Sequence, residues 1–177
     1  MKKLFFASFV LLMLSPTFSQ GIKLKNALVV GQFDKPEDRF SLEINLTEML
    51  SMQGVKAYPS LNMLKQGADQ SLLASDTITQ AVLLKGFDTY LVVNVKGYDR
   101  KFKKSLVLPV LSEVLNRVSL YHIYKDEVTS VTFEFTFYRG NQPIYSEILK
   151  CGNVSNREDV VKKLRKKMPK LIEKWKL

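Results

Sequence analysis

The sequence contains very little cysteine and histidine. Among its 177 residues there is one cysteine, Cys151, and one histidine, His122. A single cysteine cannot form an intramolecular disulfide, and zinc sites built from several Cys and His ligands cannot be assembled within one such chain. We therefore expect no disulfide framework, no metal site and no cofactor.

Linkers, repeats and low-complexity tracts are also absent. The chain has 8 Gly and 6 Pro, is 46% hydrophobic and 25% charged, and shows no segment that recurs at a fixed period. This ordinary globular composition excludes collagen-like, repeat-built and disordered classes. Because no linker-like stretch interrupts residues 20–177, we predict that they form one domain.

The amino-terminal apolar run is too short to be a membrane span. A charged start at residues 1–3 precedes eleven apolar residues at 4–14, and small residues follow at Thr17 and Ser19. About 20 apolar residues are needed to cross a bilayer, so we interpret residues 1–19 as a cleavable signal peptide rather than an uncleaved anchor. Cleavage is expected between Ser19 and Gln20.

This leader predicts a periplasmic or secreted protein. A lipoprotein would need a cysteine as its first mature residue, and Cys151 lies far downstream. We therefore expect no lipid anchor by that route and no transmembrane segment after signal cleavage.

The first half of the mature chain alternates strand and helix patterns. Short apolar runs indicate strands, and apolar residues at helical spacing indicate helices between them. Pro59 ends the second strand or places it near an edge, because proline cannot donate a ladder hydrogen bond. The elements follow one another at residues 27–30, 36–50, 55–58, 76–84 and 90–95. This βαβαβ order predicts parallel strands.

The second half has an antiparallel pattern. Residues 128–138 alternate strictly between an apolar face and a polar face, as in a strand with one dry face. We expect residues 117–124 and 144–150 to pair with it through two hairpins, which gives a meander. The predicted fold class is therefore α/β, with a mixed sheet whose first half is parallel and whose second half is antiparallel. Residues 97–115 fit no element of this scheme.

The chain ends in a basic amphipathic helix, which we expect to pack on the sheet. Ser155 and Glu158 are three residues apart and suit a capping box. Nine basic residues stand against three acidic ones between positions 157 and 177. The expected core-facing stripe consists of Val161, Leu164, Met168, Leu171 and Trp175.

The cations of this helix are the first candidate site. They could bind an anionic membrane surface or an acidic envelope protein. The alternative is a solvated outer face, because the apolar stripe explains the helix unaided. Nucleic acid would be attracted by the same charge, but an exported protein rarely meets it, so no nucleic-acid partner is expected. The candidate residues are Lys162, Lys163, Arg165, Lys166, Lys167 and Lys170.

The loops after the first and third strands are the second candidate site, because open α/β sheets bind ligands at the carboxyl ends of their strands. Its residues would be Gly31 and Asp34 in one loop and Tyr98 and Asp99 in the other. One glycine falls far short of a phosphate-binding motif, so a plain turn is the alternative.

No catalytic residue is indicated. His122 lies in a predicted strand without a nucleophile motif, so we assign it a packing or surface role. Cys151 could be a nucleophile or could form an intermolecular disulfide, but a small buried side chain at a strand end is the favoured reading. Four acids share the first helix, where we expect them to stay solvated and to offset its dipole. They are Glu37, Asp38, Glu43 and Glu48.

Three phrases resemble a group of bacterial proteins. Residues 28–31 lead through Arg39 and Glu43 into residues 54–57, residues 86–88 run into 91–93, and residues 133–145 hold the third phrase. Together they are similar to the small α/β domains of cell-envelope proteins of the TolB amino-terminal and LpoB-like type. Many members are lipoproteins, whereas this chain lacks the lipid-bearing cysteine.

The resemblance implies an interaction module of envelope assembly without a shared catalytic set. Our hypothesis is accordingly an exported, non-enzymatic protein that binds an envelope protein or an anionic surface. The alternative is a small enzyme or ligand carrier that uses the loops after the first and third strands.

Overall fold

The computed structural model describes residues 22–64, 68–117 and 121–177. The predicted signal peptide, residues 1–19, and its cleavage site at Ser19 and Gln20 lie outside these residues. The strands are β1 (Asn26–Gly31), β2 (Lys56–Pro59), β3 (Thr89–Tyr98), β4 (Ser130–Arg139) and β5 (Gln142–Gly152). The helices are α1 (Pro36–Met52), α2 (Asp76–Leu84), α3 (Leu111–Leu115) and α4 (Arg157–Lys176), with short 3₁₀ turns at Ser60–Asn62 and Gln70–Ala74.

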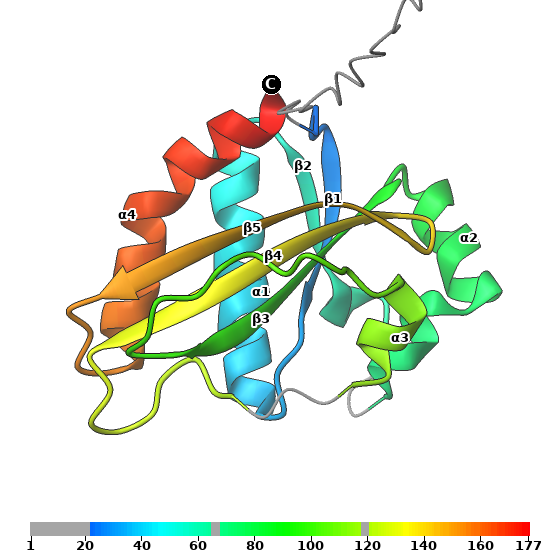
Figure 1. Ribbon diagram of the computed structural model, residues 1–177. Helices are drawn as coiled ribbons and strands as arrows, with labels where there is room; N and C mark the ends of the chain where they lie inside the picture. The colour runs from blue at the N-terminus through cyan, green and yellow to red at the C-terminus, as the bar shows by residue number, and fades with distance from the viewer. Residues whose placement is uncertain (1–21, 65–67, 118–120) are drawn as a thin grey trace, which may run out of the picture.

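These strands form a five-stranded mixed sheet in the order β2-β1-β3-β4-β5 (Figure 1). β1 pairs in parallel with both β2 and β3, and helices α1 and α2 lie in the two connections. The predicted βαβαβ half is therefore confirmed, and β2, which ends at Pro59, is an edge strand. At the opposite edge of the sheet lies β5.

The antiparallel half is confirmed, but its first strand is β3. β4 pairs antiparallel with β3 and with β5, so the prediction of a strand at 117–124 is wrong for the residues described there. Side chains bind this backbone instead of a neighbouring strand. The Tyr98 hydroxyl bonds the His122 backbone N and O at 2.9 and 2.7 Å, and the Ile123 amide donates to Asp38 at 3.0 Å. Positions 118–120 lie outside the described residues.

Helices cover both faces of the sheet. The apolar residues of β4, together with Val29 and Leu91, pack against α1 and α4. Alternate residues, such as Leu28 and Val92, pack against α2 and α3. This arrangement explains why the apolar runs of β1 and β3 are continuous, as expected of strands buried on both faces.

The polar face of β4 is also buried, although the alternation predicted only one dry face. Thr132, Glu134 and Thr136 are at most 9% exposed. The Glu134 carboxylate accepts hydrogen bonds from Lys96 Nζ at 2.8 Å and from the amide and hydroxyl of Ser105 at 3.2 and 3.0 Å. These bonds hold part of the segment at 97–115, which fitted no predicted element, against this face of the sheet.

Helix α4 packs on the sheet as predicted, but two details of its sequence pattern differ. The Asn156 side chain caps the helix by accepting from the Asp159 amide at 2.8 Å, so the Ser155 and Glu158 capping box is wrong. The buried stripe runs through Val160, Leu164, Met168, Ile172 and Trp175. Val161 and Leu171 are half-buried, one position away from the core.

Trp175 fixes the carboxyl-terminal end of α4 to the sheet. Its indole ring is 1% exposed and lies with ring centroids 5.5 Å from Phe135 and 4.9 Å from Phe137. Among the described residues, no helix combines the length and the apolar character that a bilayer span requires. The outer face of α4 carries instead most of the basic residues considered below.

Candidate functional site

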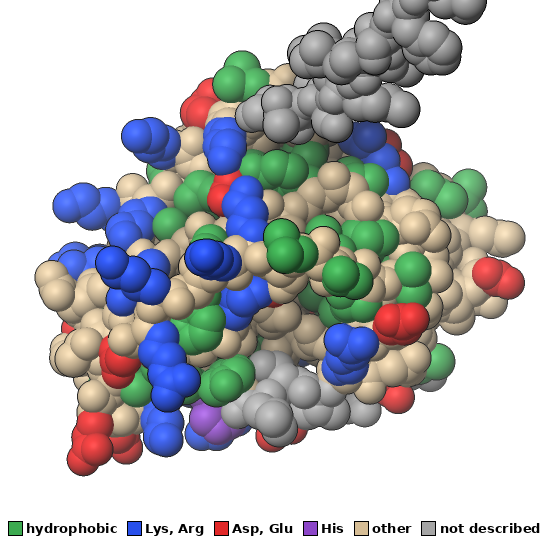
Figure 2. Space-filling model, in the orientation of Figure 1, with side chains coloured by type: hydrophobic (Ala, Val, Ile, Leu, Met, Phe, Trp, Pro, Cys, Tyr) green, Lys and Arg blue, Asp and Glu red, His purple; other side chains and the backbone are tan. Residues whose placement is uncertain are grey.

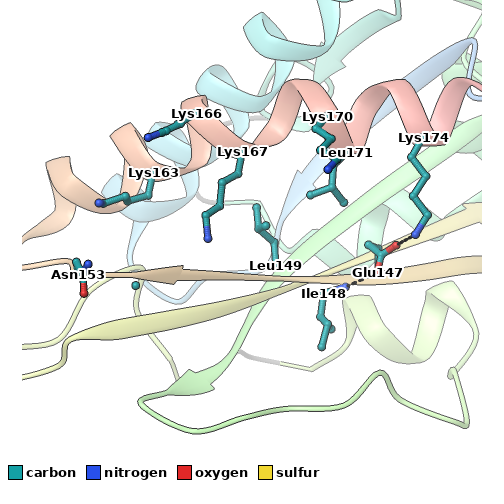
Figure 3. Close-up of a pocket in the computed structure, with 11 residues that line it drawn as sticks. Glu147, Ile148, Leu149, Asn153, Lys163, Lys166, Lys167, Lys170, Leu171 and Lys174 are labelled. Atoms are coloured by element: carbon teal, nitrogen blue, oxygen red, sulfur yellow. Dashed lines mark hydrogen bonds and ion pairs between the residues drawn. The ribbon is translucent and has the colours of Figure 1, made fainter.

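The main candidate site is an open groove between α4 and β5, with a volume of about 940 Å³. Figure 3 shows α4 running along β5, with lysine side chains from the helix and apolar side chains from the strand. We call it the edge groove. Its lining residues are Glu147, Ile148, Leu149, Gly152, Asn153, Lys163, Lys166, Lys167, Lys170, Leu171 and Lys174.

The edge groove contains four of the six predicted cations. Lys163, Lys166, Lys167 and Lys170 line it, whereas Lys162 and Arg165 lie at a shallow hollow beside Ser41 of α1. Arg165 is occupied there, because its guanidinium bonds Asn45 at 2.7 Å and Glu48 at 2.5 Å. The structure thus divides the predicted set into a groove-lining group and a group that faces α1.

Lys174 and the β5 residues were not predicted as site residues. Lys174 follows Lys170 by four positions, so helical spacing alone could have identified it. The contribution of β5 depends on the strand order, which places this strand at the edge of the sheet. No local pattern in the sequence carries that information.

One carboxylate lines the edge groove, and cations neutralise it. Glu147 is 8% exposed and forms ion pairs with Lys104 at 3.1 Å and with Lys174, while the Tyr145 hydroxyl donates to it at 2.7 Å. Burial alone would raise the pKa of Glu147, but hydrogen bonds from Lys174, Tyr145 and Lys104 hold the pKa at about 2. Glu147 is therefore ionised at neutral pH and already paired.

The remaining groove lysines leave a surplus of positive charge. In the part of the chain that the structure describes, Lys163, Lys166 and Lys170 form no ion pair with a carboxylate. Figure 2 shows blue side chains gathered over the α4 side of the molecule. Because these cations line one wall of a hollow, an anion bound there would lie near several of them at once.

The backbone of β5 faces the same groove. The Lys150 carbonyl accepts a hydrogen bond from Lys167 Nζ at 2.6 Å, and the Ile148 amide lies 3.4 Å from its neighbour Glu147 Oε1. In an antiparallel ladder the backbone groups of alternate residues point to opposite edges. Residues 146, 148, 150 and 152 therefore direct their N–H and C=O groups to the free edge, and the residues between them bond β4.

The two predicted ligand loops do not come together. A hollow of about 210 Å³ lies at the end of β1 and is lined by Asp34, but not by Tyr98 or Asp99. Gly31 is in register with Val93, so Tyr98 lies five residues, or about 16 Å, further along β3. Asp99 has a separate role, since its carboxylate accepts hydrogen bonds from Thr129 and Ser130 at the start of β4.

Several polar groups near the end of β1 are already bound within the protein. Gln32 donates to the carbonyls of Val114 and Arg117, the latter at 2.7 Å. The Gly31 amide donates to Glu43 at 3.0 Å, and the Gly31 carbonyl accepts from Gln70 at 2.9 Å. These bonds join the loop to α1, α3 and the segment before α2.

The expectation that the acids of α1 are solvated is wrong for Asp38 and Glu43, which are 1% and 0% exposed. Glu43 accepts from Arg39, Ser60 and Leu61 at 2.8 to 3.0 Å, in addition to Gly31. Both carboxylates lie among donors from several elements, so they hold α1 to the rest of the chain.

Asp38 also lies close to His122. Asp38 pairs with Arg157 at 2.7 Å, and its other oxygen lies 3.9 Å from His122 Nδ1. The prediction that His122 belongs to a strand is wrong, because it lies in the loop before β4. His122 therefore lies beside a buried carboxylate, and its packing or surface role stays a prediction.

Cys151 is 0% exposed, as its position at a strand end indicated. Burial raises the pKa of its thiol to about 11 despite the nearby Lys167 and Lys163. A thiol with that pKa is a poor nucleophile at neutral pH. Nor do the described residues contain a cluster of three or more His, Cys, Asp or Glu side chains that could hold a metal ion.

Comparisons with known proteins give no family. No family model matches the sequence. No curated protein matches it either. Among solved structures, lipoprotein GNA1162 from Neisseria meningitidis is similar at 13% identity and a TM-score of 0.40, over 84% of this chain and 98% of the other.

Two structures of the PelC dodecamer from Paraburkholderia phytofirmans are also similar. They have 12% and 11% identity to this chain and TM-scores of 0.47 and 0.46. Each match covers 89% of this chain and, respectively, 95% and 94% of the PelC chain. Likenesses of this size carry no information about partners or activity. The resemblance to TolB and LpoB-like domains stays a prediction.

Proposed function

We propose that this protein is an exported, non-enzymatic binding module of the cell envelope, and that the edge groove holds an anionic partner. The observation that carries the proposal is the groove itself. Lys163, Lys166 and Lys170 of α4 line one wall of a hollow that also has apolar side chains, and they have no carboxylate partner among the described residues. The one acid of the hollow is neutralised. Such a site attracts negative charge and offers apolar surface for burial.

The export part of the proposal rests on the leader-like pattern at residues 1–19. Amino-terminal sequencing of the protein purified from its native cells tests it. We expect the sequence to begin at Gln20, and a start at Met1 in cytosolic material would refute export.

The alternative of an enzyme or ligand carrier at the loops has less support. Gly31, Gln32 and Asp99 use their polar groups within the protein, and the two loops lie apart. The edge groove is larger, and within the described part of the chain Lys174 is the one groove lysine that forms an ion pair. A binding role therefore accounts for more of the observed geometry than a reaction does.

Site-specific photo-crosslinking tests the binding role in cells. A photo-reactive amino acid at Lys166 lies in the groove, and one at Leu84, which is 90% exposed on α2, lies outside it. We expect a discrete crosslinked product from position 166 only. Crosslinks that are equal at both positions, or absent from position 166, would contradict the proposal.

A charge-matched pair of variants adds a control. For this control the crosslinker is moved to Asn153 at the groove wall. We expect the crosslinked product to disappear when Gln replaces Lys163, Lys166 and Lys170. The same three-charge reduction at exposed lysines elsewhere, Lys23, Lys101 and Lys125, should leave it unchanged. Equal effects of the two variants would show that net charge, not the groove, directs binding.

A further inference from the structure

The free edge of β5 adds a directional feature to the edge groove. We infer that the anionic partner presents an extended acidic segment of a protein, which pairs with β5 as a sixth strand of the sheet. This inference rests on the proposed function and specifies the partner's chemistry. Three observations support it: the backbone groups at the edge, the spacing of the lysines and the apolar side chains between them.

Among the residues that the structure describes, the outward backbone groups of residues 146, 148, 150 and 152 pair with no other strand, and they lie along the groove. Proteins usually protect such an edge with charged side chains, proline or bulges, because it can pair with another chain. Here one lysine, Lys167, occupies one carbonyl, that of Lys150, in an exposed hydrogen bond. An exposed bond of this kind is easily exchanged, since water or another donor can replace it. A partner N–H that takes this carbonyl would release Lys167 to bind a carboxylate.

The lysines lie in a row that matches an extended chain. Lys163, Lys167 and Lys170 are three or four residues apart on α4, so neighbours are about 4.5–6 Å apart along the helix, and Lys174, which is paired with Glu147, continues the row. Side chains on one face of a strand recur every two residues, about 6.7 Å apart. Carboxylates at alternate positions of an added strand would therefore each lie near one lysine.

The apolar side chains suit the other positions of such a strand. Figure 3 shows Leu149 directed toward α4 and Ile148 directed to the opposite side of β5. Apolar residues that alternate with the acids would lie beside Ile148 on the far face. A flat lipid surface could use the lysines, but it could not reach the backbone groups of β5. These groups favour a peptide over a membrane.

Binding of designed peptides to residues 20–177, followed by fluorescence anisotropy, tests the inference. The probe is a labelled seven-residue peptide of alternating Glu and Val with blocked ends. Two further versions carry N-methyl groups on all Glu amides or on all Val amides. Each version keeps the charge but removes the donors along one edge of the peptide.

We expect the unmethylated peptide to bind and at least one methylated version to bind about tenfold or more weakly, because it loses several backbone hydrogen bonds. The version that loses affinity reveals the strand direction. Equal binding of all three peptides would overturn strand pairing and leave the anionic groove of the proposed function intact. Failure of the unmethylated peptide to bind would overturn the inference too.

A backbone variant of the protein gives an independent test. Lys150→Pro removes one N–H that points to the free edge and not to β4, so the β4 ladder is preserved. Lys150→Thr is its control for the lost charge. We expect Lys150→Pro to weaken peptide binding about fivefold or more relative to Lys150→Thr. Equal affinities would contradict pairing at this edge.

Vesicles of anionic phospholipid test whether the groove binds a membrane surface rather than an acidic peptide. The proteins are sedimented with vesicles in the presence and absence of the Glu-Val peptide. We expect the peptide to bind whether or not vesicles are present. Strong vesicle retention together with failure of the peptide to bind would overturn the acidic-strand inference in favour of a membrane surface. If the variant with Gln at Lys163, Lys166 and Lys170 lost both vesicle retention and peptide binding, the groove would remain the anion-binding site of the proposed function.

Discussion

Replacement of Glu43 by Gln should strongly destabilise the fold. Glu43 is 0% exposed, and its Oε1 accepts from the Gly31 amide, Arg39 Nε and the Ser60 hydroxyl, while Oε2 accepts from the Leu61 amide. This single carboxylate therefore joins α1 to the end of β1 and to the turn after β2. The structure assigns it a structural role, although it lies beside a predicted ligand loop.

The expected cost follows from these contacts. An amide at Glu43 can keep one oxygen for three donors, but its NH₂ group would then face the Leu61 amide, which is also a donor. The Arg39 guanidinium, 13% exposed, would lose its charged partner. Breaking a buried ion pair from one side costs about 3–5 kcal/mol, and we expect about 3 kcal/mol because part of the network survives.

Urea denaturation monitored by tryptophan fluorescence and circular dichroism measures this cost. For an m-value of about 1–3 kcal/mol per molar, the midpoint should fall by about 1–3 M at constant m. Glu48→Gln is the control, because Glu48 is half exposed on the same helix and should change stability by less than about 0.5 kcal/mol. A Glu43→Gln midpoint within about 0.3 M of the parent would refute the structural role.

Three further outcomes are expected. Cys151 should not react with Ellman's reagent at pH 8 in the native protein and should react fully in urea, because burial raises its pKa to about 11; rapid native reaction would contradict this. Glu147 has a pKa of about 2 in the folded protein and about 4.3 in the unfolded chain. It therefore stabilises the fold at pH values above about 4.3, and this stabilisation is lost as the pH falls toward 2. Glu147→Gln should flatten this acid loss by on the order of 1–2 kcal/mol after solvent screening, and an unchanged pH profile of urea midpoints would argue against the ion pairs. Trp175→Ala should lower the free energy of unfolding by about 3–5 kcal/mol, and Trp175→Phe by clearly less, because the indole fills the contact with Phe135 and Phe137. Urea titrations of both variants, followed by circular dichroism, measure these losses. Similar losses in the two variants would count against that packing.

The parallel half of the fold was predictable because each of its elements has a local signature. The apolar run at residues 27–30 requires a strand covered on both faces, and Pro36 suits the first turn of α1. The error at 117–124 has a physical cause. An apolar and aromatic segment resembles a strand, but here Tyr98 and Asp38 bond its backbone from elsewhere in the chain. Such long-range side-chain bonds leave no periodic pattern.

The candidate site was predictable only in part, for a related reason. The charge of α4 is visible in the sequence, and four of the predicted cations line the edge groove. Arg165 differs from them because Asn45 and Glu48 of α1 bind it, and this depends on how two distant helices meet. The role of β5 depends on strand order in the same way. Local pattern thus revealed the charge, while tertiary packing decided which cations face the groove.

Amide hydrogen exchange of residues 20–177, followed by nuclear magnetic resonance with and without the Glu-Val peptide, tests the edge groove most directly. The amides of Ile148 and Lys150 point to the free edge, whereas those of Leu149 and Cys151 point to β4. We predict that the peptide slows exchange at Ile148 and Lys150, while Leu149 and Cys151 are slow in both states. Unchanged exchange at the two edge amides, with peptide-induced shifts confined to the loop at 32–34, would contradict the account.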